Sequence, residues 1–113
     1  MTVANLTQTA EQTLDVIEAF KAARMPLNEA KDFTSALLEK ALDDIEANPL
    51  LYPVDLSAQE YGITLRRWID PENQYVCLYR YFPEPDVAIL DIFASTRQDY
   101  QSLLYMILIS RRD

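Results

Sequence analysis

The chain has 113 residues, half of them hydrophobic, which is typical of one folded domain with a substantial core. Its single glycine and six scattered prolines argue against a low-complexity or disordered chain, and its longest apolar run (103–109) is shorter than the about 20 residues that span a bilayer. Its net charge of −8 makes the protein as a whole repel nucleic acid. We predict a single domain over residues 1–113.

The charge is unevenly spread along the chain. Residues 1–60 carry 11 acidic and 4 basic residues, whereas residues 61–113 carry 7 acidic and 6 basic residues. Six of the seven arginines lie in that second half. An anionic partner would therefore have to meet a local arginine patch there.

The sequence favours a reducing, cytoplasmic location. Residues 1–12 have neither the basic nor the apolar stretch of a signal peptide. Cys77, the one cysteine, cannot form an internal disulfide, and its strand-like surroundings predict a small buried side chain rather than a reactive thiol.

The first elements are a short predicted strand at residues 2–6 and a helix over residues 10–24. Thr7 or Thr9 can cap this helix, whose apolar residues recur at steps of three and four. The helix ends before Pro26, which cannot continue it.

A second, longer helix is predicted over residues 29–47, with Asn28 as its N-cap and Asn48-Pro49 at its end. The two helices form a hairpin whose outer faces are acidic. We interpret these faces as a solvated surface; the alternative is an acidic binding site.

After the proline-rich connection 49–61, the apolar period changes from helical to alternating. Three strands are predicted, at residues 62–69, 75–82 and 87–94, and short turns join them into an antiparallel meander. A last helix begins after Thr96. The predicted fold class is α+β, a helical hairpin packed on a twisted antiparallel sheet in the order β-α-α-β-β-β-α.

Several common kinds of site are excluded by residue content. Without histidine there is no Ser-His catalysis, and one cysteine without histidine makes a zinc site improbable. Gly62 is the only glycine, so there is no glycine-rich phosphate loop. We expect no metal and no cofactor.

The candidate binding residues are arginines and tyrosines of the second half, because arginine binds phosphates and carboxylates and tyrosine anchors interfaces. Arg66 and Arg67 are adjacent and so lie on opposite faces of a strand. The other candidates are Arg80, Tyr81, Arg97 and Tyr100. The alternative is a structural role for each, such as a pair of Arg66 with Asp70 or with a helix carboxylate.

The last predicted helix is apolar on every side. Leu104 and Leu108 share a face that can pack on the sheet. Tyr105, Met106 and Ile109 are then left for a segment of a partner protein or a second copy of the chain to cover. The alternative is complete burial within the monomer.

The order of these segments resembles the RelE/ParE superfamily of toxins from bacterial toxin–antitoxin (plasmid stabilisation) modules. The stretches that carry this resemblance are "LTQTAEQTLDVI", "ALLEKALDDIEANPLLYP", "YGITLRRWIDPENQYVCLYRYF" and "VAILDIFASTRQDY". Together they cover nearly the whole chain. The resemblance implies two helices packed on a twisted antiparallel sheet, and an antitoxin that wraps and neutralises the toxin.

The superfamily contains RelE-like ribonucleases, which cut messenger RNA on the ribosome, and ParE-like members, which poison DNA gyrase. Where RelE-like members carry Gly-Tyr-Arg, this chain reads Gln74-Tyr75-Val76, so one arginine of that set is absent. The resemblance therefore implies a ParE-like toxin without catalytic residues. Its partner-binding residues would be Arg66, Arg80, Tyr81, Arg97, Tyr100, Tyr105, Met106 and Ile109.

Two alternatives stay open. In the first, the chain is a RelE-like ribonuclease in which Arg67 and Arg97 clamp the scissile phosphate and Tyr100 assists proton transfer. In the second, it is a degenerate member of the superfamily that only binds an antitoxin or itself.

Overall fold

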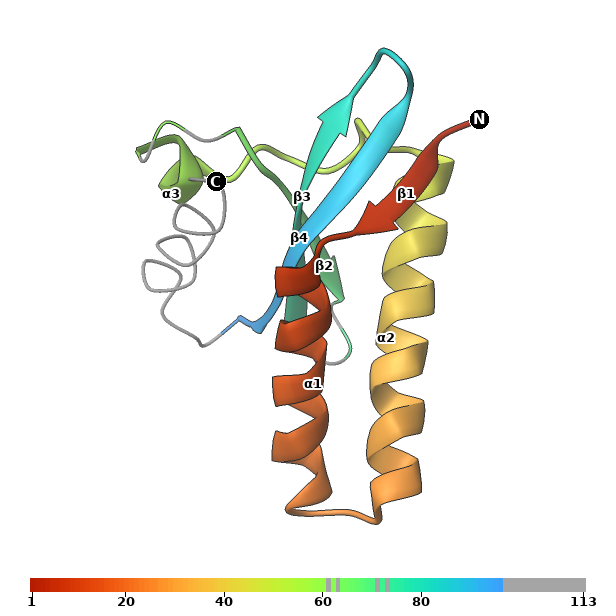
Figure 1. Cartoon of the computed structure of the whole chain (residues 1–113). Helices are drawn as coiled ribbons and strands as arrows, with labels where there is room; N and C mark the ends of the chain where they lie inside the picture. The colour runs from red at the N-terminus through yellow and green to blue at the C-terminus, as the bar shows by residue number, and fades with distance from the viewer. Residues whose placement is uncertain (61, 63, 71, 73, 97–113) are drawn as a thin grey trace.

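The computed structural model describes residues 1–60, 62, 64–70, 72 and 74–96. The elements follow in the order β1 (Val3–Leu6), α1 (Gln8–Ala22), α2 (Leu27–Ala47), α3 (Leu56–Glu60), β2 (Arg66–Asp70), β3 (Tyr75–Phe82) and β4 (Val87–Ser95). This is the predicted α+β fold: a helical hairpin against a sheet (Figure 1). The predicted last helix lies outside the described residues.

The two long helices begin at different kinds of N-terminus. Thr7 is the N-cap of α1, and its hydroxyl accepts a hydrogen bond of 3.0 Å from the Ala10 amide. The predicted cap of α2, Asn28, is wrong, because the helix already begins at Leu27. Pro26 occupies the N-cap position with extended backbone and makes no side-chain cap bond. Helix α1 ends at Ala22, before Pro26, as predicted.

The sheet is mixed, with strand order β1-β4-β3-β2. Strands β2, β3 and β4 form the predicted antiparallel meander, but β1 runs parallel to β4, so an all-antiparallel sheet is a wrong prediction for this strand. The meander leaves the outer side of β4 open. The first strand fills it, with the Thr7 amide donating to the Leu90 carbonyl at 3.1 Å.

Strand β2 begins four residues later than predicted, and the connection before it runs along the outer edge of the strand. The Asp55 amide donates to the Leu65 carbonyl at 2.7 Å, and the Arg67 amide donates to the Pro53 carbonyl at 2.9 Å. Asp55 also caps the short helix α3, which was not predicted: its carboxylate accepts from the Ala58 amide at 3.1 Å.

One face of the sheet packs against both long helices and forms the core (Figure 1). The buried core residues are Ala10, Leu14, Ile17, Leu37, Ala41, Ile45, Trp68, Tyr75, Cys77, Tyr79, Ala88, Leu90 and Phe93. Cys77 is fully buried, as predicted. Among the described helices, none is long and apolar enough to cross a membrane.

The hairpin between β3 and β4 turns at the predicted "PEPD" segment. Asp86 has a positive φ of 74°, and its amide donates to the Phe82 carbonyl at 3.1 Å. Aspartate tolerates this left-handed conformation better than most residues. The turn fixes the register of the two longest strands.

Candidate functional site

The arginines of β2 and β3 lie on both faces of the sheet. Arg66 pairs with Tyr79 and so lies on the helix side, whereas Arg67 pairs with Leu78 and lies on the opposite side with Arg80. The predicted opposition of Arg66 and Arg67 is therefore confirmed.

Arg80 forms a two-bond ion pair with Asp91. Its Nε donates to Asp91 Oδ2 at 2.7 Å and its Nη2 to Asp91 Oδ1 at 2.9 Å. The arginine side chain is 25% exposed and the aspartate only 4%. The register of β3 against β4 shifts by one residue at this point, so Asp91 is the extra residue of a bulge. A fork-to-fork pair of this kind is directional and holds both side chains in place.

Arg66 bonds to backbone carbonyls and not to Asp70, the partner that the alternative of a structural role suggested. Its guanidinium donates to the Tyr52 carbonyl at 2.6 Å, with a longer contact of 3.5 Å to the Leu50 carbonyl. Asp70 is instead bonded by Lys40 Nζ at 3.0 Å. Arg66 thus anchors the connection that precedes α3.

Tyr81 joins the hairpin to β1 through Asp86. The tyrosine hydroxyl donates to Asp86 Oδ1 at 2.6 Å, and the Thr2 hydroxyl donates to the same oxygen at 2.7 Å. The Tyr81 hydrogen bond, followed by that of Thr2, lowers the pKa of Asp86, and the same bond to the carboxylate raises the pKa of Tyr81. The carboxylate is ionised at neutral pH and ties three segments together.

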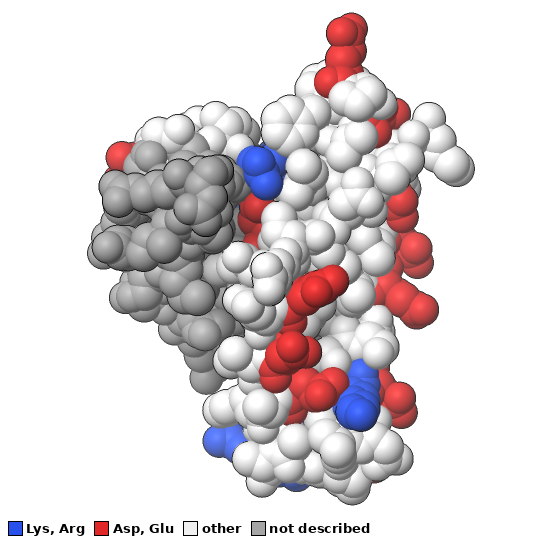
Figure 2. Space-filling view, in the orientation of Figure 1, with Lys and Arg blue, Asp and Glu red and all other residues white. Residues whose placement is uncertain are grey.

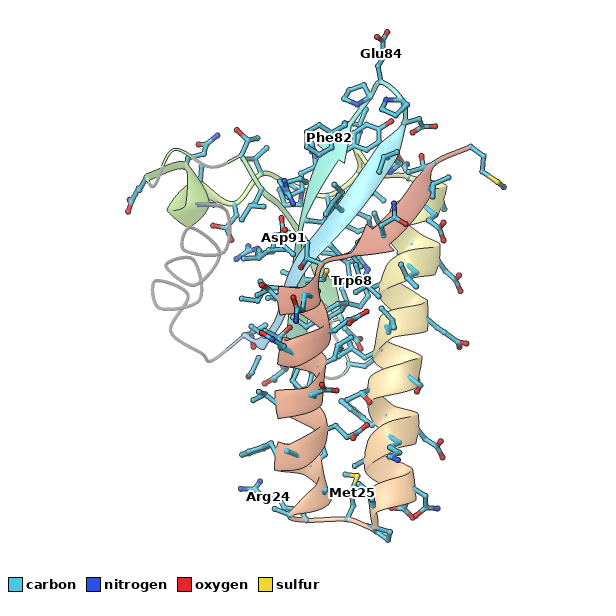
Figure 3. All side chains as sticks on the ribbon, viewed as in Figure 1. Arg24, Met25, Trp68, Phe82, Glu84 and Asp91 are labelled. Carbon is cyan, nitrogen blue, oxygen red and sulfur yellow. The ribbon has the colours of Figure 1, made fainter. Side chains whose placement is uncertain are left out.

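A groove of about 280 Å³ runs along the end of β3, and we call it the arginine groove. Its lining residues are Leu50, Thr64, Arg66, Arg80, Tyr81, Phe82 and Pro83. It thus brings together three predicted partner-binding residues, Arg66, Arg80 and Tyr81. Phe82, one of the lining residues, lies just below the hairpin tip that carries Glu84 (Figure 3).

The remaining candidates are not brought together by the described structure. Arg67 lies on the sheet face away from the helices, where Val76, Leu78 and Ile92 are fully buried. The other predicted residues, Arg97, Tyr100, Tyr105, Met106 and Ile109, lie outside the described residues.

Acidic side chains are spread over the surfaces of α1 and α2, with few basic ones between them (Figure 2). A second depression, of about 330 Å³, lies between these helices and β1 and includes Glu11 and Asp15. Within the described part of the chain, no group of three or more potential ligands could hold a metal ion. The acidic faces fit the predicted solvated surface.

Two features were not predicted from the sequence: the role of Asp91, and the groove residues that are neither arginine nor tyrosine. Asp91 is an acid inside the otherwise apolar run "VAILDIFA". A carboxylate among buried strand residues needs a cation or several donors, and this signal could have identified it. Leu50, Thr64 and Phe82 carry no comparable signal, because only the fold brings them together.

No family model matches this chain, and no curated protein matches it.

Proposed function

We propose that this chain is the toxin of a bacterial toxin–antitoxin module, of the ParE-like kind. It acts in the cytoplasm by binding DNA gyrase, and a cognate antitoxin holds it inactive. Neither metal nor cofactor enters the activity, and nucleic acid and membrane are not its direct partners.

The order and packing of the described elements support this proposal. The resemblance implies a helical hairpin on one face of a twisted sheet, and α1 and α2 pack in that way on β2, β3 and β4. A fold alone hosts many functions, so the choice within the superfamily depends on the arginines.

The observation that carries the choice of a binding toxin over a nuclease is the buried Val76 at the position where the RelE-like pattern has arginine. A ribonuclease of this kind needs cations free to stabilise a phosphate. Val76 supplies no cation at its position, and Arg80, the one basic residue of β3 on the same sheet face, is already paired with Asp91, so it does not replace the missing arginine. One missing donor of this type costs about 10²–10³ in rate.

The runner-up, a RelE-like ribosome-dependent ribonuclease, is favoured by one observation. Arg67 is partly exposed on the sheet face away from the helices, and it forms no ion pair with any residue that the structure describes. With Arg97 and Tyr100 it would supply the phosphate clamp and the proton donor.

Controlled expression tests the toxin proposal. We expect induction to stop growth, and co-expression of the small reading frame beside the gene to restore it. A chain that leaves growth unchanged at high expression, with no such neighbouring frame, would contradict the proposal. An Asp43→Asn variant of the exposed face of α2 should remain toxic and serves as a control for expression.

A further inference from the structure

Strand β3 is longer than its neighbour β2, which leaves part of its edge open. The first residue of β2, Arg66, pairs with Tyr79. Residues 80–82 therefore have β4 on one side, and no strand of the described chain pairs with their other side. An open edge of this kind presents unpaired backbone groups to a partner.

The direction of those groups follows from the bonds around Arg66. The Arg67 amide and the Leu65 carbonyl point outward to residues 53–55. Because successive residues of a strand alternate, the backbone groups of Arg66 point to β3 and those of Tyr79 point back to β2.

The same alternation gives the direction of the backbone groups in the open segment, residues 80–82. The backbone groups of Arg80 and Phe82 point to β4, which agrees with the bond from the Asp86 amide to the Phe82 carbonyl. Those of Tyr81 point to the open edge. None of the backbone bonds made by loops in the described part of the chain reaches Tyr81.

The arginine groove lies on this edge and has a definite charge. Asp91 balances the charge of Arg80, whereas Arg66 bonds only to backbone carbonyls, and no carboxylate of the described residues pairs with it. None of the lining residues that the structure describes is acidic. Leu50 and Phe82, 58% and 42% exposed, provide apolar walls.

We infer that the arginine groove is a strand-addition site, which takes an extended segment of another protein with alternating apolar and acidic side chains. The Tyr81 amide and carbonyl bond to the backbone of the segment, Arg66 binds a carboxylate on the helix side of the sheet, and Phe82 on the opposite side holds the apolar side chains. This inference does not require that the chain be a toxin or bind gyrase.

A designed peptide tests the site directly. The probe is acetyl-Val-Glu-Val-Glu-Val-amide, added to the ¹⁵N-labelled protein at up to 1 mM, with the lysine analogue acetyl-Val-Lys-Val-Lys-Val-amide as control. We expect the acidic peptide to shift the Tyr81 amide resonance and to slow its hydrogen exchange severalfold. The Arg80 amide, already bonded to β4, should change little in exchange rate.

Two variants and a matched control test whether the positive charge of Arg66 binds the acidic peptide. Arg66→Gln should weaken peptide binding about two- to fivefold. Thr64→Glu, at an exposed lining position, should weaken it as much without removing any bond of Arg66. Arg67→Gln, an adjacent arginine outside the groove, should bind the peptide like the original chain.

Several results would overturn the inference. These are no binding at 1 mM, equal binding of the lysine peptide, or protection of amides in β1 instead of Tyr81. Tyr81 protection that rises with protein concentration in the absence of peptide would assign the edge to a second copy of this chain. Displacement by a single-stranded oligonucleotide that binds more tightly than the peptide would assign the groove to nucleic acid.

Discussion

Arg80 on β3 and Asp91 on β4 neutralise each other through two hydrogen bonds of 2.7 and 2.9 Å, at the point where the register between their strands shifts. The bulge that inserts Asp91 places its carboxylate against the guanidinium on the sheet face away from the helices. The positive charge of Arg80, a predicted partner-binding residue, is thus largely neutralised within the fold.

The first prediction concerns this pair. Asp91→Asn should lower the free energy of unfolding by about 1–3 kcal/mol, because it leaves a partly buried arginine without its counter-charge. Urea unfolding measures the change, with Asp43→Asn on the exposed face of α2 as a control that should stay within about 0.5 kcal/mol. Equal stability of the two variants would show that the pair is dispensable.

The second prediction concerns Tyr81 and Asp86. Tyr81→Phe removes the hydrogen bond that contributes most to the lowered pKa of Asp86, so this pKa should rise towards its ordinary value of 3.8. Thr2→Val should raise it less. Titration of the carboxyl ¹³C resonance measures both.

A lowered folded-state pKa stabilises the fold above the unfolded-state value, and this contribution is lost as the pH falls through the folded-state value. The Tyr81→Phe variant should therefore lose less stability on acidification than the original chain. A larger rise of the Asp86 pKa in Thr2→Val than in Tyr81→Phe would contradict the assigned cause.

The third prediction concerns alkaline pH. Burial raises the pKa of Cys77 well above 9.0 and is the main cause that raises the pKa of Tyr79 above 10.0. The unfolded chain then releases these protons at a lower pH than the folded chain, so stability should fall as the pH rises through about 9–10.

Urea unfolding between pH 7 and 10.5 checks this alkaline loss. Cys77→Ala should remove its lower part and Tyr79→Phe its upper part, although each variant is also less stable at neutral pH because it alters the core. A slope unchanged in both variants would assign the loss to other groups.

The fourth prediction concerns the C-terminal apolar segment. Replacing Met106 and Ile109 with Asp should abolish antitoxin binding or dimerisation while the circular dichroism spectrum stays native-like, because charges in an apolar interface are costly. Ser102→Asp with Ser110→Asp adds the same charges at polar positions of that segment. A double variant that fails to fold, or that binds with unchanged affinity, would contradict the hypothesis that a partner covers Met106 and Ile109.

Local patterns predict the elements of this fold better than they predict its pairings. The apolar periods identify both long helices, and the "PEPD" turn predicts β3 and β4 to within a residue. The parallel pairing of β1 with β4 depends on which edge of the sheet the meander leaves open. Five-residue α3 has no period of its own, so neither feature could be read from local sequence.

The candidate site shows the same division. Adjacent positions correctly predict opposite faces for Arg66 and Arg67. The acid inside the apolar run of β4 indicates that Asp91 needs a cation, but its pairing with Arg80 depends on a one-residue bulge. The partner of Arg66 depends on the path of residues 50–55, and neither the bulge nor this path leaves a pattern in the sequence. The groove is therefore visible only in the fold.

The most direct test of the proposed function is a supercoiling assay with purified gyrase, relaxed plasmid and ATP. The account predicts that the protein inhibits supercoiling in proportion to its concentration, that the antitoxin relieves the inhibition, and that ribosome-bound messenger RNA stays intact. Undisturbed supercoiling together with ribosome-dependent cleavage of messenger RNA, lost in Arg97→Ala, would contradict it and establish the ribonuclease.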